Sequence, residues 1–424
     1  MFGGEDEYEY DEKRPIVMDN GAGYIKAGFA QYYDDPPIII PSIVGYPRYA
    51  GSMMNTLKYG YQKEYFVGNE AESKRGVLKI KYPIEHDTIK NYDDMEKIWF
   101  HIFVNELRAA SEEHNVMLTE CSTKRRDNRE KIAEIMFEEF GVPGLYIINQ
   151  TVLSLFSAGL NTGIVVNLGD GVSQFSPIFE GFELKKANIQ YDFGGRELTE
   201  YFINILQGYG YKIYSSSQRE IAKEIKEKGC FFTLDNKYET IEPFNYELPD
   251  GNTITIKDPE IRCLKSYFNP KLYDLTKYDF NLYSIWQKCY DSIQSCDIDI
   301  RKDLYSHVFL SGGTSMLQGL PELLKKDLIT LAPPSMKENV KVIARYDRKY
   351  SVGGEDKFYL RFRLLKTCGL LKLNMKIMEH RLLEEHFFSL DIIIFNIWWI
   401  YFILNLFRLI FLINVFILFE QKIQ

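Results

Sequence analysis

The sequence predicts an α/β protein of duplicated construction, with a sheet and its helices present once in each half of the chain and a cleft between the halves. Two observations predict this class. Two glycine-rich turns, at residues 18–26 and 167–173, lie about 150 residues apart, and each joins one strand-forming run to another. A strand-rich block followed by amphipathic helices also occurs twice along the 424 residues, a length sufficient for two domains with full cores.

Each glycine turn has the composition of a strand, a tight turn and a returning strand. The apolar runs Pro15–Met18 and Gly163–Val166 come directly before the two turns, and β-type residues follow both. Successive backbone N–H groups in such a turn can hold an anion, and glycine lets a phosphate approach where a Cβ would block it. Because each turn also carries an aspartate, Asp19 or Asp170, the pair indicates two clamps on one polyphosphate and its cation.

Helical periodicity marks five segments of the chain. At 91–107 apolar residues recur near helical spacing, and Asp93 and Asp94 lie where a helix N-terminus favours acids. A third glycine turn, Leu310–Met316, follows a predicted strand at 307–310. The predicted helices cover residues 91–107, 128–141, 150–158, 198–206 and 218–229. We interpret the charge run in the last of these helices as a solvated face.

Composition excludes several classes of protein. The formal net charge is −8 and no basic run dominates, so no nucleic-acid partner is expected. Six cysteines without C-x-x-C spacing indicate free thiols in a reducing compartment, neither a disulfide framework nor a zinc site. Residues 1–13 are acidic and lack an apolar core, so we expect a disordered acidic arm and not a signal peptide. His114, an isolated histidine, is expected at the surface.

Six short segments carry a more specific signal than the glycine turns: Tyr82–His86, Asp93–Trp99, Val152–Leu155, Tyr246–Gly251, Asp299–Tyr305 and Arg348–Val352. In these segments the chain resembles the actin family, and the resemblance extends from about residue 14 to residue 352. Because these segments lie well beyond the glycine turns, they separate the chain from enzymes of the sugar-kinase branch, which share the fold.

The resemblance implies the duplicated actin-like, ribonuclease H-like ATPase fold, with two domains around a nucleotide cleft. The cleft would hold ATP or ADP together with Mg²⁺ or Ca²⁺. The first domain would cover residues 14–157, with a small subdomain inserted at 41–81. The second domain would cover residues 158–350, with a small subdomain inserted at 194–282.

The resemblance also assigns residues to the nucleotide site. The first and second glycine turns would bracket the β- and γ-phosphates, and Lys26 would reach the phosphates as a point charge. Asp19 would act on the metal through water, since Mg²⁺ keeps much of its hydration shell. The residues at cofactor-binding positions are Asp19, Gly21, Ala22, Gly23, Tyr24, Lys26, Gly169, Asp170, Gly171, Val172, Gly195, Lys226, Glu227, Gly312, Gly313, Thr314, Met316 and Lys349. For Lys226 and Glu227 a solvated helix face is the plainer interpretation, but the resemblance favours contact with the nucleotide.

The chain departs from the family at the positions that serve hydrolysis. The glutamine that the family uses near the attacking water is present as Gln150, but Asn167 replaces an aspartate and Gln174 replaces a histidine. Ala22 also lacks the serine hydroxyl of the family's first turn. These replacements remove a negative charge and a titratable group. We therefore expect nucleotide binding with slow or lost ATP hydrolysis, a weak ATPase at most.

Two surface segments, 49–66 and 264–295, are longer than the filament-contact regions with which they align in actin. We expect an actin-like cytoskeletal protein of the cytoplasm, filament-forming or filament-associated. Its partners would be copies of itself, other actin-like subunits or actin-binding proteins. The alternative is a non-polymerising, actin-related subunit of a larger regulatory assembly.

The resemblance ends after Val352, and residues 351–424 form an apolar tail with two interpretations. Leu390–Phe419 is apolar enough for a membrane span, although polar residues interrupt it, and would then be a tail anchor. We favour a shifted reading frame from about Phe358 onward, because codons read one frame apart allow a string that resembles the family's C-terminus. No membrane attachment is expected unless the tail is genuine.

Overall fold

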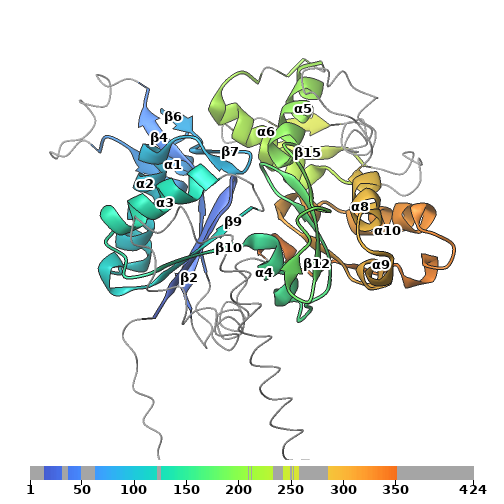
Figure 1. Ribbon diagram of the computed structural model, residues 1–424. Helices are drawn as coiled ribbons and strands as arrows, with labels where there is room; N and C mark the ends of the chain where they lie inside the picture. Colours follow the sequence, from blue (N-terminus) through green and yellow to red (C-terminus); the bar gives the residue numbers. More distant parts are fainter. Residues whose placement is uncertain are drawn as a thin grey trace, which may run out of the picture. The chain divides into compact units, whose positions relative to one another are not determined.

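The computed structural model describes residues 14–30, 37–48, 63–121, 126–208, 210–211, 213–232, 242–248, 251, 253–256 and 285–350. All of these residues belong to one compact unit that runs to Thr367, and Figure 1 shows their ribbon. The expected acidic arm at 1–13, most of the segments 49–66 and 264–295, and the tail at 351–424 lie outside the described residues.

The first sheet has five strands in the order β10-β9-β1-β2-β3. They are β1 (Ile16–Asn20), β2 (Tyr24–Phe29), β3 (Ile38–Pro41), β9 (Val116–Glu120) and β10 (Leu145–Asn149). β1 and β2 are antiparallel neighbours whose register places Asp19 opposite Lys26. On its other side β1 runs parallel to β9, and β9 runs parallel to β10. The first glycine turn therefore joins two adjacent strands of one sheet.

The second sheet repeats this construction in the order β18-β17-β11-β12-β13, with β14 also paired to β12. Its strands are β11 (Gly163–Leu168), β12 (Ser173–Phe179), β13 (Phe182–Glu183), β14 (Ile189–Tyr191), β17 (Val308–Ser311) and β18 (Val342–Ile343). β11 is antiparallel to β12 across the second glycine turn, parallel to β17 on its other side, and β17 is parallel to β18. Strand order and direction therefore match in the two sheets, which is the repeated α/β construction that the sequence predicts.

Within the described residues, three small sheets accompany the two large ones. They pair β4 (Val44–Pro47) with β5 (Phe66–Val67) and β6 (Leu78–Lys81), β7 (Ile84–Glu85) with β8 (Thr88–Ile89), and β15 (Phe244–Glu247) with β16 (Thr253–Ile256). The helical elements are α1 (Gly68–Ser73), α2 (Tyr92–His101), η1 (Ile102–Leu107), η2 (Ser111–Glu113), α3 (Arg126–Glu138), α4 (Gln150–Ser157), α5 (Gly195–Gly208), α6 (Ser216–Gly229), α8 (Ile285–Gln294), α9 (Ile298–Ser306), η5 (Gly313–Met316), α10 (Leu320–Leu331), η6 (Lys337–Asn339) and η7 (Arg348–Tyr350).

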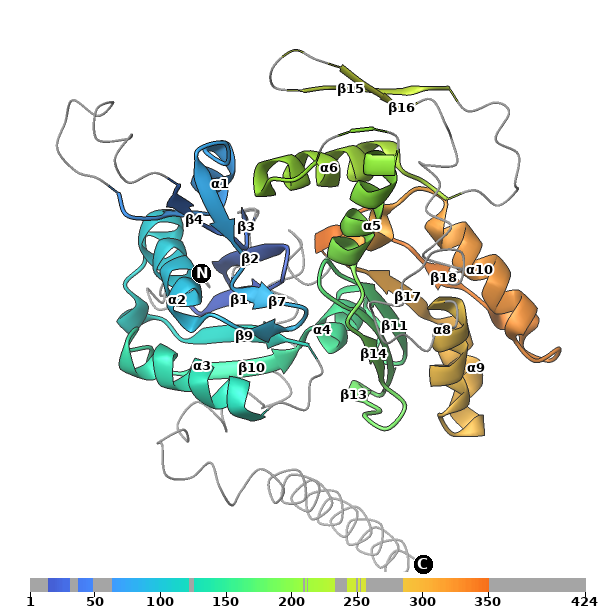
Figure 2. The ribbon, with the colours of Figure 1, turned by 90° about the horizontal axis from the view of Figure 1, so that it is seen from above.

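Each large sheet has its own hydrophobic core, so we call the elements around them the first half and the second half. In the first half, α2 and α3 pack on the first sheet, with Met18 and Trp99 buried between them. In the second half, α5, α8, α9 and α10 pack on the second sheet around Phe202 and Trp286, and α6 packs on α5, as can be followed in Figure 2. Burying a large apolar side chain of this kind contributes about 1.5–3 kcal/mol, so each half carries its own source of stability.

Helix α4 belongs to the first half by chain order and to the second half by packing. It follows β10 directly, and the side chain of Asn149 caps it by accepting the backbone N–H of Thr151. Leu155 of α4 packs with Val165 and Phe309 of the second sheet. Its first residue, Gln150, therefore lies at the junction of the two halves.

The expectation of a surface position for His114 is wrong. Only 7% of this residue is exposed, its Nδ1 lies 2.7 Å from the carbonyl oxygen of Arg14, and its ring packs edge-on against Phe29. His114 precedes β9, which pairs with β1, and that pairing buries it. An isolated histidine gives no local sign of a pairing between strands about a hundred residues apart.

The interpretation of residues 218–229 as a solvated face is wrong on one side of α6. Glu220, Lys223 and Lys226 recur every three residues and so share a helix face. Glu220 is 7% and Lys226 is 3% exposed, whereas Glu227, nearer the end of the helix, is exposed. The many charged residues of this helix predicted exposure to solvent, but on this face the charged groups pack against the rest of the protein.

The remaining sequence expectations that this part of the chain can address concern thiols and membrane spans. Cys121, Cys230, Cys289 and Cys296, the cysteines within the described ranges, carry free thiols, as predicted. Among the helices of those same ranges, none has the length and apolarity that crossing a bilayer requires.

Candidate nucleotide site

The first glycine turn, between β1 and β2, has an ion pair at its base. Lys26 Nζ lies 2.6 Å from Asp19 Oδ2, and both side chains are largely buried. The hydroxyl of Thr119 on β9 donates to the other carboxylate oxygen of Asp19. The backbone N–H of Gly21 turns back to the carbonyl of Asp19 at 3.0 Å, which keeps the turn tight. A cation and a carboxylate are thus held side by side under the turn.

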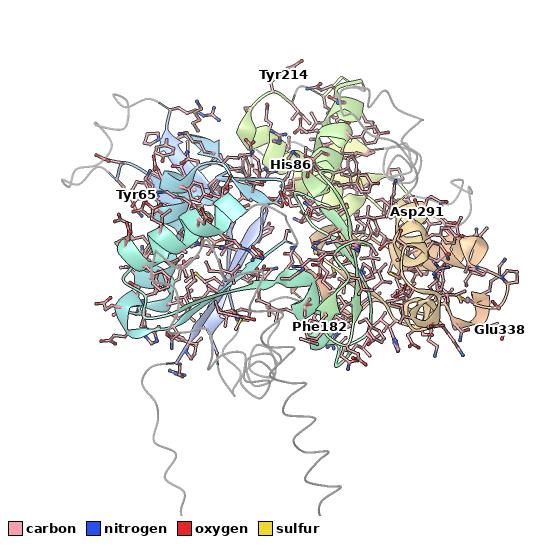
Figure 3. All side chains as sticks on the ribbon, in the orientation of Figure 1. Tyr65, His86, Phe182, Tyr214, Asp291 and Glu338 are labelled. Atoms are coloured by element: carbon pink, nitrogen blue, oxygen red, sulfur yellow. The ribbon has the colours of Figure 1, made fainter. Side chains whose placement is uncertain are left out.

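The second glycine turn, between β11 and β12, lies against the first. A Cβ on Gly23 would lie 2.9 Å from the Cβ of Asp170, and a Cβ on Gly171 would lie 2.9 Å from the Cβ of Ala22. A Cβ on Gly171 would also lie 2.2 Å from the carbonyl oxygen of His86, the residue labelled in Figure 3. The two turns are therefore in direct contact, and glycine is required because no side chain fits between them.

Arg196, near the start of α5, fastens the two turns together, and the sequence reasoning missed it. Its guanidinium donates to the carbonyl oxygens of Ala22, at 3.1 Å, and Ile84, at 3.2 Å. The guanidinium also lies 3.4 Å from the carboxylate of Asp170. The backbone N–H of Arg196 donates to the Asp170 carbonyl at 2.9 Å. Arg196 directly follows Gly194 and Gly195 in the sequence, and this position was the available sign of a functional residue. That pattern alone does not indicate a long-range contact.

The third glycine turn, after β17, closes on the second. The hydroxyl of Thr314 and the backbone N–H of Gly195 both donate to the carbonyl of Gly169, at 2.8 and 3.0 Å. Gly312 has a φ of 90°, and a Cβ there would lie 2.3 Å from the carbonyl oxygen of Leu168. The first turn therefore contacts the second at Asp170 and Gly171, and the third turn contacts it at Gly169.

Two lysines of α6, Lys223 and Lys226, lie near the second glycine turn. Lys226 donates to the carbonyl of Gly195 at 2.6 Å and to the hydroxyl of Thr199 at 2.8 Å. Burial lowers the pKa of Lys226. Burial would also lower the pKa of Lys223, but the carboxylates of Asp170 and Glu220 outweigh it and raise that pKa. Lys223 therefore stays cationic beside the second turn.

Asp170 also stays charged. Burial would raise the pKa of its carboxyl group, but three nearby cations, of which Lys223 is first, outweigh burial and lower it. The second turn thus carries a fixed negative charge within a positive setting. Such a setting suits anionic ligands once the cations exceed the carboxylates around them.

The remaining predicted residues lie at the margin of this group. Lys349 of η7 lies beside Gly313, with 3.9 Å between its Cγ and a Cβ on that glycine, and its ammonium lies over the ring of Tyr24. Met316 is 38% exposed, and Glu227 is also exposed. These two side chains make no hydrogen bond or ion pair with the glycine turns in the described part of the chain. Val172 is buried at the end of the second turn, where its carbonyl accepts the N–H of Gly169.

The three residues linked with hydrolysis lie on α4, β11 and β12. The amide of Gln150 donates to the thiol of Cys121, whose pKa is raised by burial and then by the charges of Asp87 and Asp19. Asn167 and Gln174 are opposite each other in the β11–β12 register. Gln174 is fully buried, and within the described residues neither atom of its amide has a hydrogen-bond partner. Buried polar groups are nearly always paired, so this amide is a candidate partner for a group of a bound ligand.

Replacing Gln174 by methionine tests that assignment. The substitution removes an unpaired buried amide at nearly constant volume, so it should raise the free energy of unfolding of the nucleotide-free protein by about 1 kcal/mol. Gln190→Met is the matched control. The amide of Gln190 donates to Asp87 at 2.6 Å, so this variant should lower the free energy of unfolding by about 1–2 kcal/mol. Urea unfolding measures both. Equal destabilisation by the two variants would show that Gln174 already has a partner in the free protein.

A comparison with known families agrees with this arrangement. The family model described as actin matches residues 10–354, which is well over half of the chain. The matched range includes both large sheets, all three glycine turns and every candidate site residue. The chain belongs to the actin family.

Proposed function

We propose that the chain binds ATP or ADP together with a divalent cation and acts as an actin-like cytoskeletal protein, filament-forming or filament-associated. The observation that carries the proposal is the contact between the two glycine turns, with Lys26 and Asp19 held at the base of the first. Two turns from different sheets bring backbone N–H groups to one place, which suits the phosphates of a single ligand.

The donor set fits a nucleotide and its cation. Lys26 would turn its ammonium from Asp19 to the phosphates, and the freed carboxylate would then face the cation through water. No group of three histidine, cysteine, aspartate or glutamate side chains converges within the described ranges. One carboxylate is nevertheless sufficient for Mg²⁺, since this ion keeps several waters and takes its other ligands from phosphate oxygens. The cation would supply charge neutralisation of the phosphates.

The candidate ribose and base contacts lie on the second half. Gly195, Lys226 and Thr314 are joined to the second turn through hydrogen bonds that meet at Gly169 and Gly195. Gly312 and Gly313 give the backbone of the third turn room for close approach. Lys349 adds a charge at the edge of this group.

Calorimetric titration of the full chain with ATP and ADP, each with Mg²⁺, tests the binding proposal. We expect saturable binding of both nucleotides and weaker binding when the cation is removed with a chelator. Absence of heat for both nucleotides, with a protein that shows a cooperative unfolding transition, would overturn it.

Hydrolysis is proposed to be slow because Asn167 and Gln174 are neutral amides that do not accept a proton at ordinary pH. We expect single-turnover phosphate release to be slower than in ordinary actin. The double variant Asn167→Asp/Gln174→His restores the family's charged and titratable groups and should speed release at least about tenfold, since a positioned proton acceptor contributes roughly 10²–10⁴. A wild-type rate equal to that of ordinary actin contradicts the proposal.

Sedimentation with ATP, Mg²⁺ and salt separates the two modes of action. A pellet that forms only with nucleotide supports a filament of the chain itself or with other actin-like subunits. A protein that stays in the supernatant supports a non-polymerising subunit of a larger assembly. In either case the proposed location is the cytoplasm and its cytoskeleton, with actin-binding proteins as further partners.

A further inference from the structure

We propose that Tyr24 controls nucleotide exchange: its ring, carried by the first sheet and held by two lysines of the second half, must be released before a nucleotide enters or leaves. This inference rests on the proposed nucleotide binding. It assigns to Tyr24 a role that its position beside the first turn does not by itself imply.

Tyr24 reaches from one half of the molecule to the other. It is the first residue of β2 and directly follows the first glycine turn. The ammonium of Lys223, on α6, lies 4.7 Å from the centroid of its ring, and the ammonium of Lys349, on η7, lies 5.0 Å from the same centroid. Both distances fall within the range of cation–π attraction. One side chain of the first half is therefore held by two separate elements of the second half.

Lys223, one of the two lysines that contact the ring, keeps its charge. Lys223 is largely buried, and Asp170 and Glu220 favour its charged form. A cation–π contact is stronger where water is excluded, so the contact of this partly desolvated lysine exceeds that of an exposed pair. The Tyr24 phenol stays neutral, because burial raises its pKa. The ring therefore keeps its π face for the lysines throughout the physiological pH range.

The ring is coupled to the turn that would bind phosphate. A Cβ on Gly21 would lie 2.5 Å from the carbonyl oxygen of Tyr24, so the backbone of Tyr24 forms one wall of the first turn. Lys349 is at once a candidate ligand contact and a partner of the ring. The contact of the Tyr24 ring with Lys223 and Lys349, which we call the strap, therefore holds the two halves together beside the site. Its strength sets the rate at which the site opens.

Three substitutions at this position separate the ring from the hydroxyl group. Tyr24→Leu removes the π system and should speed nucleotide release about tenfold, whereas Tyr24→Phe keeps the ring and should stay within about twofold of wild type. Tyr24→Trp offers the best cation–π partner and should slow release. Tyr214→Leu is the control, since Tyr214 is 80% exposed. Release is measured by chasing bound etheno-ATP with excess ATP at fixed Mg²⁺ in the full chain.

A second measurement needs no nucleotide. The acetylation rate of Lys349, followed by mass spectrometry in nucleotide-free protein, should rise in Tyr24→Leu and stay near wild type in Tyr24→Phe. If Tyr24→Leu does not fold, the comparison between Tyr24→Trp, which should release nucleotide more slowly than wild type, and Tyr24→Phe, which should release it at about the wild-type rate, carries the test.

The outcomes distinguish this inference from the proposal beneath it. If the wild type binds no nucleotide, both fall. If the wild type binds nucleotide but Tyr24→Leu releases it at the wild-type rate, with Lys349 no more reactive, the strap is wrong and nucleotide binding stands. If Tyr24→Phe releases as fast as Tyr24→Leu, the hydroxyl group and not the ring is responsible, and the inference is overturned.

Discussion

Gly171→Ala is expected to abolish measurable nucleotide binding and to lower the free energy of unfolding by about 1–3 kcal/mol, as overpacking does. The added Cβ would lie 2.2 Å from the carbonyl oxygen of His86 and 2.9 Å from the Cβ of Ala22. The first of these atoms is backbone, so a side-chain rotation does not relieve the clash. The turns must move apart, and a ligand that needs both would lose one of them.

Gly76→Ala is the matched control for this substitution. Gly76 is exposed, a Cβ there meets nothing within 4 Å, and its φ is not in the left-handed region. We expect unchanged nucleotide affinity and nearly unchanged stability, measured by calorimetry and by urea unfolding. Wild-type affinity in Gly171→Ala would mean that the nucleotide does not depend on contact between the turns.

Lys26→Met is expected to have the second large effect, on both stability and binding. It leaves the carboxylate of Asp19, which is 2% exposed, with the hydroxyl of Thr119 but no cation. Breaking a buried ion pair from one side destabilises by about 3–5 kcal/mol. Nucleotide affinity should also fall, because the charge proposed to meet the phosphates is gone.

The double variant Asp19→Asn/Lys26→Met separates the two effects. With no charge left unpaired, most of the lost stability should return, while nucleotide binding should stay weak. Urea unfolding of both single variants and the double variant completes the cycle. A double variant as unstable as Lys26→Met alone would mean that the Asp19 charge is not the cause. Normal nucleotide affinity in Lys26→Met would exclude this lysine from the phosphates.

The glycine turns and the elements around them could be predicted because their signals are local. The apolar runs before each turn became β1 and β11, and the periodic segment at 91–107 became α2 and η1, with Asn91 as its N-cap. Glycine chemistry and hydrophobic periodicity act within a few residues, so a single sequence reveals them.

The contacts between the halves could not be predicted in the same way. Arg196 meets Ala22 and Ile84 across more than a hundred residues, and nothing beside it in the sequence records those partners. The buried face of α6 was misjudged because charged residues usually meet water. The three-residue spacing of Glu220, Lys223 and Lys226 was visible in the sequence, but what that face packs against was not.

Helix α4 has a mechanical consequence. Its N-terminus follows β10 directly, while Leu155 packs against the second sheet. A twist of one sheet against the other would therefore be taken up in part at Asn149 and Gln150, where the helix leaves the strand. Such a twist would also change the orientation of the Gln150 amide toward Cys121.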